Sequence, residues 1–283
     1  MIQKVSNTDS VRALFGDWQE TVIWSCLANT MGDLYADNLE QPGSVMAILG
    51  DFCYLAGKPA EVLAAFKPDW HDKDFIIMVP QNRAWGEMIE KVWGKKAKKV
   101  TRYALKKESG VFDLEKLQRA VDALPEEYTL KMIDEELYSQ TRALEWCCDW
   151  TAQYNTSEEF KVHALGAVVL RDGEPVSGAS TYSHYPGGIE IEIDTRADYQ
   201  KKGLAYVCAA KLILECEKRG LYPSWDARTR ISVHLAEKLG YCFAGEYDAY
   251  EIYGYNRLPA LSTSTIAAFW LTFSSRAIAE MLA

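Results

Sequence analysis

Two acidic side chains stand at a spacing that suits proton transfer. Glu190 and Glu192 alternate with isoleucines in the stretch IEIEIDT, which begins at Ile189. On a strand, residues two apart share one face, and two neighbouring carboxylates repel each other, which can raise one pKa toward the range of a general base. The same alternation is also typical of a solvated strand face, or of a surface that binds a cationic molecule.

A glycine-containing loop follows this strand, with the sequence DYQKKGLAY over residues 198–206. It matches neither the P-loop signature GxxxxGK[ST] nor the dinucleotide-binding signature GxGxxG. Gly203 permits a close approach of the backbone to a ligand, and the free N–H groups of the next helical turn favour an anion. Lys201 and Lys202 add positive charge. The stretch indicates either a phosphate-binding loop or a tight turn with solvated lysines.

The loop and its surroundings resemble those of a known enzyme family. Residues 200–205, QKKGLA, match the Q/R-x-x-G-x-G/A motif of the GCN5-related N-acetyltransferase (GNAT) superfamily, where the motif follows a strand and opens a helix. The run ISVHLAEKLGY, residues 231–241, is similar to the family's later helix and the start of the next strand. The wider stretch, which begins at Ile191 and ends at Tyr241, looks like the subgroup of zwittermicin-resistance-type acetyltransferases. The resemblance covers residues 125–255.

The resemblance implies acetyl-CoA as a cosubstrate and an amine as the acetyl acceptor. In the family the loop amides hold the pyrophosphate, which corresponds to Gln200, Lys201, Lys202, Gly203, Leu204 and Ala205, with Tyr206. The preceding strand pairs through its backbone with the pantetheine arm, which corresponds to Ile193, Asp194 and Thr195. A backbone N–H of that strand would also polarise the thioester carbonyl. The segment YPSWDA would separate from the strand and open the acetyl site.

Acetyl transfer also needs a base for the acceptor ammonium group, and an acid helps the departing thiolate. We expect Glu192, or Glu190, to be the base. Family members with a tyrosine acid often carry it four positions before the glycine that ends the last helix, which is here Ala236. The asparagine often found near the start of that helix corresponds to Thr229. The candidate substitutes for the acid are Ser232, Tyr241 and Tyr182, and a thiolate also leaves without an acid.

Alternating and helical patterns predict the elements that must position these residues. In the C-terminal half they are three antiparallel strands over 163–195, a helix over 205–219, a strand over 221–227, a helix over 229–239 and a strand over 246–255. In the N-terminal half they are a strand over 45–57, a helix over 59–67, a strand over 75–80, a helix over 82–93 and a strand over 99–107. This order indicates an α/β (α+β) fold, a GNAT-like mixed central sheet flanked by helices.

The two halves also resemble each other. MIEKVWG followed by KVTRYAL is similar to HLAEKLG followed by EYDAYEI, which suggests two tandem copies of one fold, the N-terminal copy being degenerate and without a phosphate loop. We expect residues 1–124 to form an N-terminal α/β domain that shapes the substrate site. Residues 125–258 would form the acetyltransferase domain, and residues 259–283 a helical tail.

Composition limits the partners. The net charge of −9 and the pI of about 5.1 argue against nucleic acid and suit a small polar amine as substrate. The seven cysteines without CxxC spacing, and the absence of a long apolar run, predict a cytoplasmic protein with no membrane contact. The four histidines lack metal-site spacing, so we expect no metal. The alternative function is a non-catalytic acyl-CoA-binding sensor or scaffold that kept the loop and lost the acid.

Overall fold

The computed structural model describes residues 2–257. The segment 259–283, expected to be a helical tail, lies outside the described residues. The chain divides into two compact units. Unit 1 comprises the residues up to Thr101 and from Asp248 onward, and unit 2 comprises Arg102–Tyr247.

These limits differ from the domain boundary expected near residue 124. The chain passes between the units within strands β6 (Ala97–Leu105) and β13 (Phe243–Tyr253). Helix α5 (Leu114–Asp122) packs on α8 (Leu204–Lys218), the helix that follows the glycine-containing loop. The segment before residue 124 therefore belongs to the same unit as the loop, because its apolar face is buried there.

Unit 2 contains a five-stranded sheet in the order β11-β10-β9-β8-β7. Its strands are β7 (Thr129–Met132), β8 (Gly166–Arg171), β9 (Glu174–Tyr185), β10 (Gly188–Thr195) and β11 (Tyr222–Ser224). Neighbours are antiparallel except for the parallel pair β10 and β11, which confirms the expected mixed sheet. Asp172 and Gly173 connect β8 to β9 with φ of 53° and 84°, as a two-residue hairpin turn of type I′ requires.

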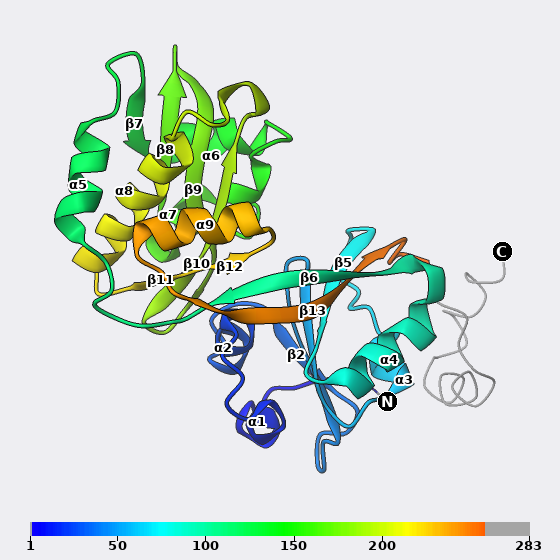
Figure 1. Ribbon diagram of the computed structural model, residues 1–283. Helices are drawn as coiled ribbons and strands as arrows, with labels where there is room; N and C mark the ends of the chain where they lie inside the picture. Colours follow the sequence, from blue (N-terminus) through cyan, green and yellow to red (C-terminus); the bar gives the residue numbers. More distant parts are fainter. Residues whose placement is uncertain (1, 258–283) are drawn as a thin grey trace. The chain divides into compact units, whose positions relative to one another are not determined.

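Helices cover both faces of this sheet (Figure 1). Val169 of β8 joins a core with α5 and α8, whereas the adjacent Val168 joins a separate cluster around Trp150. The remaining helical elements of unit 2 are α6 (Glu135–Arg142), η2 (Cys148–Trp150), α7 (Ser157–His163), η3 (Ala197–Tyr199) and α9 (Arg230–Leu239). Neighbouring residues of a strand point to opposite faces, so α8 and η2 lie on opposite sides of the sheet.

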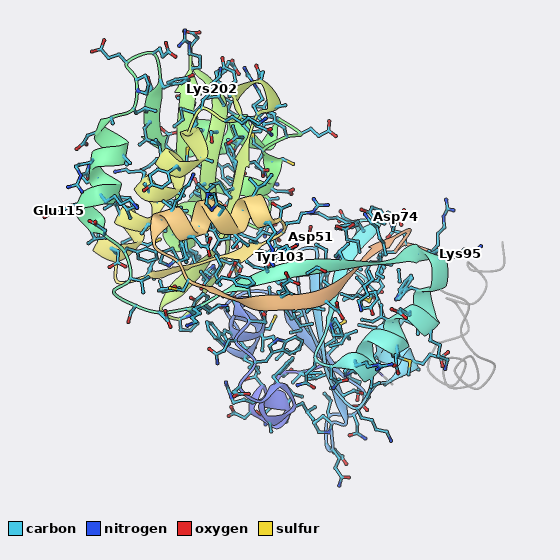
Figure 2. The ribbon with its side chains drawn as sticks, in the orientation of Figure 1. Asp51, Asp74, Lys95, Tyr103, Glu115 and Lys202 are labelled. Atoms are coloured by element: carbon cyan, nitrogen blue, oxygen red, sulfur yellow. The ribbon has the colours of Figure 1, made fainter. Side chains whose placement is uncertain are left out.

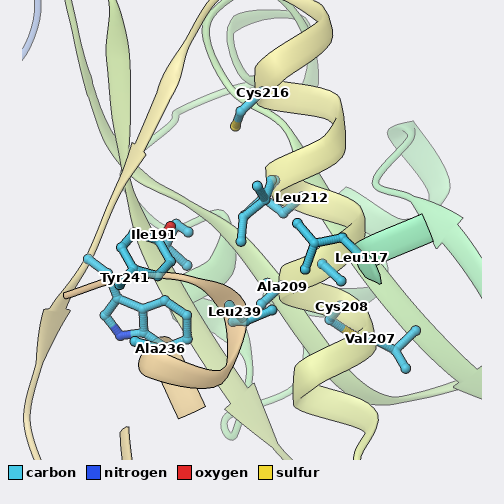
Figure 3. Packing of buried hydrophobic residues seen from close by; sticks show 14 of the residues in the cluster. Leu117, Ile191, Val207, Cys208, Ala209, Leu212, Cys216, Ala236, Leu239 and Tyr241 are labelled. Atoms are coloured by element: carbon cyan, nitrogen blue, oxygen red, sulfur yellow. The ribbon is translucent and has the colours of Figure 1, made fainter. Parts of the chain in front are cut away.

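The larger core of unit 2 forms where α8 and α9 meet the sheet (Figure 3). Leu212 of α8 and Ala236 of α9 are both fully buried in it. Helix α9 begins where the Thr229 side chain accepts a hydrogen bond from the Ser232 amide at 3.2 Å, and it ends before Gly240, as expected. Tyr241, the residue after Gly240, is buried in the same core.

Unit 1 also has a mixed sheet, in which the strands follow the order β1-β2-β3-β4-β5-β13-β6. Its elements are β1 (Gln3–Lys4), α1 (Asp9–Phe15), α2 (Thr21–Leu27), β2 (Asp33–Ala36), β3 (Ser44–Leu49), β4 (Phe52–Gly57), α3 (Glu61–Ala64), β5 (Phe75–Pro80), α4 (Arg83–Trp93) and η1 (Gly94–Lys96). The single strand expected over 45–57 is wrong, because the chain turns at Gly50 and Asp51 and forms the antiparallel pair β3 and β4.

The two units share most of their order of elements, and unit 2 has α5, η2, η3 and β12 (Asp226–Ala227) in addition. In each, two helices precede three antiparallel strands, then a helix, a parallel strand, a further helix and a final strand. This order supports the expectation of two tandem copies. The helix after the third antiparallel strand has 15 residues in α8 but only 4 in α3. Unit 1 therefore lacks the long helix whose first turn could bind a phosphate.

The cysteines of the described chain are all free thiols, and five of the seven are buried. Burial raises the pKa of Cys147, Cys208 and Cys216 to about 12, so these thiols keep their protons near neutral pH. Thiols that are buried and protonated in this way are typical of reduced core residues. Within residues 2–257, no helix is both long enough and apolar enough to cross a bilayer.

Candidate active site

Strands β10 and β11 lie side by side for only three residue pairs and then separate. Glu190 and Ser224 form the last of these pairs. Strand β10 continues to Thr195 in its ladder with β9, whereas the chain beyond Ser224 turns to β12 (Asp226–Ala227), which pairs with β6. The strands thus form a fork that opens beyond Glu190. This confirms the expected separation of the segment YPSWDA from the strand before the loop.

The ladder between β9 and β10 changes register at the fork. Glu190 lies opposite Ser183, and the next residue, Ile191, lies opposite Thr181. The extra residue of this irregularity is on β9, where Tyr182 lies between these two partners, so the alternation along β10 is kept. Ile189 and Ile191 belong to one core cluster, and Glu190 and Glu192 therefore lie on the opposite face of β10, although their neighbours differ.

Glu190 lies in an aromatic environment and is only 9% exposed. Burial, with a contribution from the charge of Glu190, raises the pKa of Tyr222 to about 12 and raises the pKa values of Tyr185 and Tyr241 further. The Tyr185 hydroxyl is 2.8 Å from the Ser224 hydroxyl at the closed end of the fork. Glu190 is thus surrounded by phenols that keep their protons.

Glu192 has a carboxylate neighbour instead, Asp194, which lies two residues further along β10. Partial burial raises the pKa of Asp194 to about 6, and the charge of Asp149 acts in the same direction. Glu192 and the charge of Arg228 act against this rise. The half-buried Glu192 is therefore the more accessible of the two expected base candidates.

The loop over residues 200–206 leads into helix α8 and contains two residues with positive φ. Lys201 and Gly203 have φ of 63° and 80°, and a Cβ built on Gly203 meets nothing within 4 Å. The first helical bond of α8 is donated by Val207 to the Gly203 carbonyl at 3.3 Å. Among residues 2–257, no acceptor is recorded for the amides from Lys201 to Tyr206. A run of N–H groups without acceptors at a helix start fits a diphosphate.

Positive side chains lie on this loop and just before it, and Lys202 is labelled in Figure 2. Lys202 Nζ lies 4.3 Å from the centroid of the Tyr199 ring, and the Arg196 guanidinium lies 4.6 Å from the same centroid. Arg196 also donates hydrogen bonds of 2.8 and 3.0 Å to Asp198, and this contact lowers the pKa of Asp198. Counting Lys201, the loop carries an excess of positive charge.

The position of the missing acid and the residues expected to replace it are buried or hydrogen-bonded to other parts of the fold. Ala236 is fully buried, so a tyrosine has no space at that position (Figure 3). Tyr241 is buried and donates its hydroxyl hydrogen to the Pro223 carbonyl, and burial raises its pKa well above the usual value. Ser232 accepts a hydrogen bond of 3.1 Å from Trp225, and Tyr182 is only 6% exposed.

Two residues near Asp194 were missed by the sequence-based expectations, Asp149 and Arg228. No local signal marks them, because both reach Asp194 from other elements of unit 2. The sequence does mark Asp194, because its acidic side chain continues the alternation of Glu190 and Glu192 with apolar residues. Among residues 2–257, no group of three or more His, Cys, Asp or Glu side chains has the arrangement of a metal site.

Comparisons with known proteins agree with this geometry. A profile of the GNAT acetyltransferase family matches residues 12–250 and therefore spans both units. A GCN5-related N-acetyltransferase-like protein from Streptococcus suis 89/1591, of known crystal structure, is 48% identical with a TM-score of 0.82, over 87% of this chain and 98% of that chain.

Two more distant proteins are also similar, one in sequence and one in fold. The uncharacterized N-acetyltransferase YdfB of Bacillus subtilis strain 168 is 26% identical over 266 residues, which cover 85% of this chain and 94% of that protein. A glucosamine N-acetyltransferase region of a fungal multi-domain GH3 β-N-acetylglucosaminidase has a TM-score of 0.58 at 12% identity, over 89% of this chain and 38% of that chain. The family match over most of the chain shows that this protein belongs to the GNAT acetyltransferase family and is an N-acetyltransferase.

Proposed function

We propose that this enzyme transfers the acetyl group of acetyl-CoA to the amine of a small polar molecule by direct attack. The observation that carries the proposal is the combination of a fork beyond Glu190 with an anion-binding loop at the end of the same strand. From Ile191 to Thr195 the strand extends for about 13 Å, at roughly 3.3 Å per residue. An elongated ligand with phosphates at one end suits this arrangement.

Acetyl-CoA supplies the acetyl group as a thioester. In the proposal, the amides of Gln200, Lys201, Lys202, Gly203, Leu204, Ala205 and Tyr206 hold its pyrophosphate. The backbone of Ile193, Asp194 and Thr195 pairs with the pantetheine arm, on the strand edge from which β11 has separated. An N–H group of β10 near the register change at Ile191 donates to the carbonyl oxygen, where negative charge develops during the reaction.

Glu192 is the proposed base, and Glu190 is the alternative. Glu192 is half-buried beyond the fork and adjoins other carboxylates, which favours its taking a proton. Glu190 is more buried and lies among protonated phenols. The structural contacts of Tyr241 and Ser232 support a departure of the thiolate without either side chain as its acid.

The acidic surroundings support a cationic acceptor. Glu192, Asp194 and Asp149 lie close together, with Arg228 as the positive neighbour. An amine that is protonated at neutral pH is attracted to such a group and can lose its proton there. The resemblance to the zwittermicin-resistance subgroup adds an aminopolyol or antibiotic-like compound to the acceptors that we propose to test.

The experiment is a screen of amines with acetyl-CoA, in which the release of the CoA thiol and the mass of the product are measured. We expect thiol release that depends on the amine, together with a product heavier by one acetyl group. A set of polyols without an amino group is the control and should give no product. Stabilisation of the protein by acetyl-CoA without turnover for any amine would favour the acyl-CoA sensor instead.

A further inference from the structure

The chain leaves β10 after Ser224, at a point where a longer ladder would bring two carboxylates together. Glu190 and Ser224 are opposite each other in a parallel register, so two further residues on each strand would place Asp226 opposite Glu192. Like charges on directly opposite residues of neighbouring strands are destabilising. The residue type at position 226 therefore disfavours a longer ladder with β10, and the Asp226 carboxylate finds its partners elsewhere.

These partners are Arg102 of β6 and Tyr247 of β13, the first and last residues of unit 2. Arg102 donates a hydrogen bond of 2.6 Å from Nε to Oδ1 of Asp226, and its terminal nitrogen forms an ion pair with the same oxygen. The Tyr247 hydroxyl donates to the other oxygen, Oδ2, at 2.6 Å. The Arg102 side chain is 9% exposed and that of Asp226 16%, so salt in the solvent screens this ion pair only weakly.

Backbone pairing and a buried ring hold the same segment. Strand β12 is antiparallel to β6, where its two residues lie opposite Tyr103 and Ala104. Trp225, which precedes β12, is buried, and its ring N–H donates a hydrogen bond of 3.1 Å to the Ser232 hydroxyl of α9. The chain beyond the fork is thus bound to β6 and α9 rather than to β10.

We infer that Asp226 is a positioning residue, which keeps the fork between β10 and β11 open for the pantetheine arm through its contacts with Arg102 and Tyr247. This inference rests on the acetyl transfer proposed above and names the side chains that shape its acyl-CoA site. Within residues 2–257, residues 191–195 of β10 pair only with β9, because β11 is held away from them. A site that is open before the ligand arrives avoids the cost of separating two strands.

The first test needs no ligand and follows amide hydrogen exchange of the full chain by NMR. Tyr247→Phe removes one hydrogen bond to Asp226, so we expect the amides of residues 225–227 to exchange about tenfold faster than in the wild type. The ladder between β9 and β10 should keep its exchange rates. Tyr253→Phe is the matched control, because its hydroxyl also donates to a carboxylate on β13, that of Glu251 at 3.0 Å. Equal exchange of residues 225–227 in the wild type and Tyr247→Phe would overturn the inference.

The second test separates the fork from the loop with two ligands. Acetyl-CoA would occupy both, whereas 3′-phospho-ADP, the diphosphate end of CoA, needs only the amides of residues 200–206. Tyr247→Phe should raise the Kd of acetyl-CoA about tenfold and leave that of 3′-phospho-ADP unchanged, and Tyr253→Phe should change neither.

Asp226→Asn should have a larger effect on acetyl-CoA than Tyr247→Phe, which keeps the ion pair and decides the test if Asp226→Asn does not fold. An equal loss of affinity for both ligands would indicate a merely structural role, and an unchanged Kd of acetyl-CoA would show that the fork does not depend on Asp226. Either result would refute the inference. If neither ligand binds the wild-type chain, the proposed function fails, whereas hydrogen exchange still decides whether these contacts hold the fork.

Discussion

Glu190 and Ser224 are the last residues that β10 and β11 place opposite each other. Ser224 is fully buried and its hydroxyl meets that of Tyr185, so this end of the fork is closed. On the other side of the pair, β10 continues alone with β9 toward the loop at Gln200. In the proposed function, the position of this one pair sets how far an acyl group can reach along β10 and which carboxylates lie beside it.

The loop can be tested with two glycines that share a backbone conformation. Gly203 has φ of 80° and Gly173 in the β8–β9 turn has φ of 84°, and a Cβ at either meets nothing within 4 Å. Replacing either by glutamate should cost about 1 kcal/mol of folding free energy, because a side chain disfavours positive φ. Only Gly203→Glu should also lose the stabilisation by acetyl-CoA, measured as a shift in Tm.

The stabilisation that causes this Tm shift can be calculated. A ligand at a hundred times its Kd adds about 2.7 kcal/mol to the free energy of unfolding. Wild type and Gly173→Glu should both gain this stabilisation from acetyl-CoA, since the β8–β9 turn lies away from the amides of residues 200–206. Equal shifts in all three proteins would mean that the loop does not hold the pyrophosphate.

The two glutamates should differ in their effect on the reaction. Glu192→Gln should lower kcat about a hundredfold to ten-thousandfold, the usual range for the loss of a general base. Glu190→Gln should lower kcat less, because its carboxylate is buried among phenols rather than beyond the fork. Steady-state rates at saturating acetyl-CoA measure this difference, with the Tm shift as a check of binding. A larger loss in Glu190→Gln would assign the base to that residue.

Tyr241 should contribute to stability and not to catalysis. Its hydroxyl is fully buried and donates to the Pro223 carbonyl next to the fork. Tyr241→Phe leaves that carbonyl without its partner, so we expect a loss of about 1–3 kcal/mol in urea unfolding. The rate per folded molecule should stay close to that of the wild type. A large fall in kcat without a change in stability would make Tyr241 the acid after all.

Acid should weaken the fold in part through Glu215. Hydrogen bonds from Lys211 and Lys218, both of 2.9 Å, lower its pKa to about 2 in the folded chain. A carboxyl whose folded pKa is below its unfolded value stabilises the protein above the unfolded value and loses that effect as the pH falls. Free energies of unfolding between pH 5 and pH 2 should therefore fall less steeply in Glu215→Gln than in the wild type.

The elements that hold the site were predictable because their signals are local. The Asp172-Gly173 turn, the QKKGLA loop and Gly240 at the end of α9 each mark a boundary within a few residues. In unit 1 the break at Gly50 was missed, since all six residues of β3 are buried and no alternation separates β3 from β4. Strands that are buried on both faces show only a continuous apolar run.

The neighbours of the base were not predictable from the sequence. The register change between Glu190 and Ile191 depends on the ladder with β9, and no residue type in IEIEIDT indicates it. Asp149 lies in η2, and the Trp150 ring of η2 packs on Gly178 of β9, a contact between distant parts of the chain. Sequence patterns identified the carboxylates of β10, whereas tertiary packing decides which other charged side chains lie near them.

That packing contact gives a last prediction. A Cβ on Gly178 would lie 2.5 Å from the Trp150 ring, and Trp150 is fully buried, so the ring has no free space to move into. Gly178→Ala should therefore destabilise the protein by about 1–3 kcal/mol, as overpacking does, and should change the tryptophan fluorescence. Gly245→Ala is the matched control, a strand glycine whose Cβ would meet nothing within 4 Å. Equal stabilities of the two variants would show that Trp150 does not hold η2 against β9.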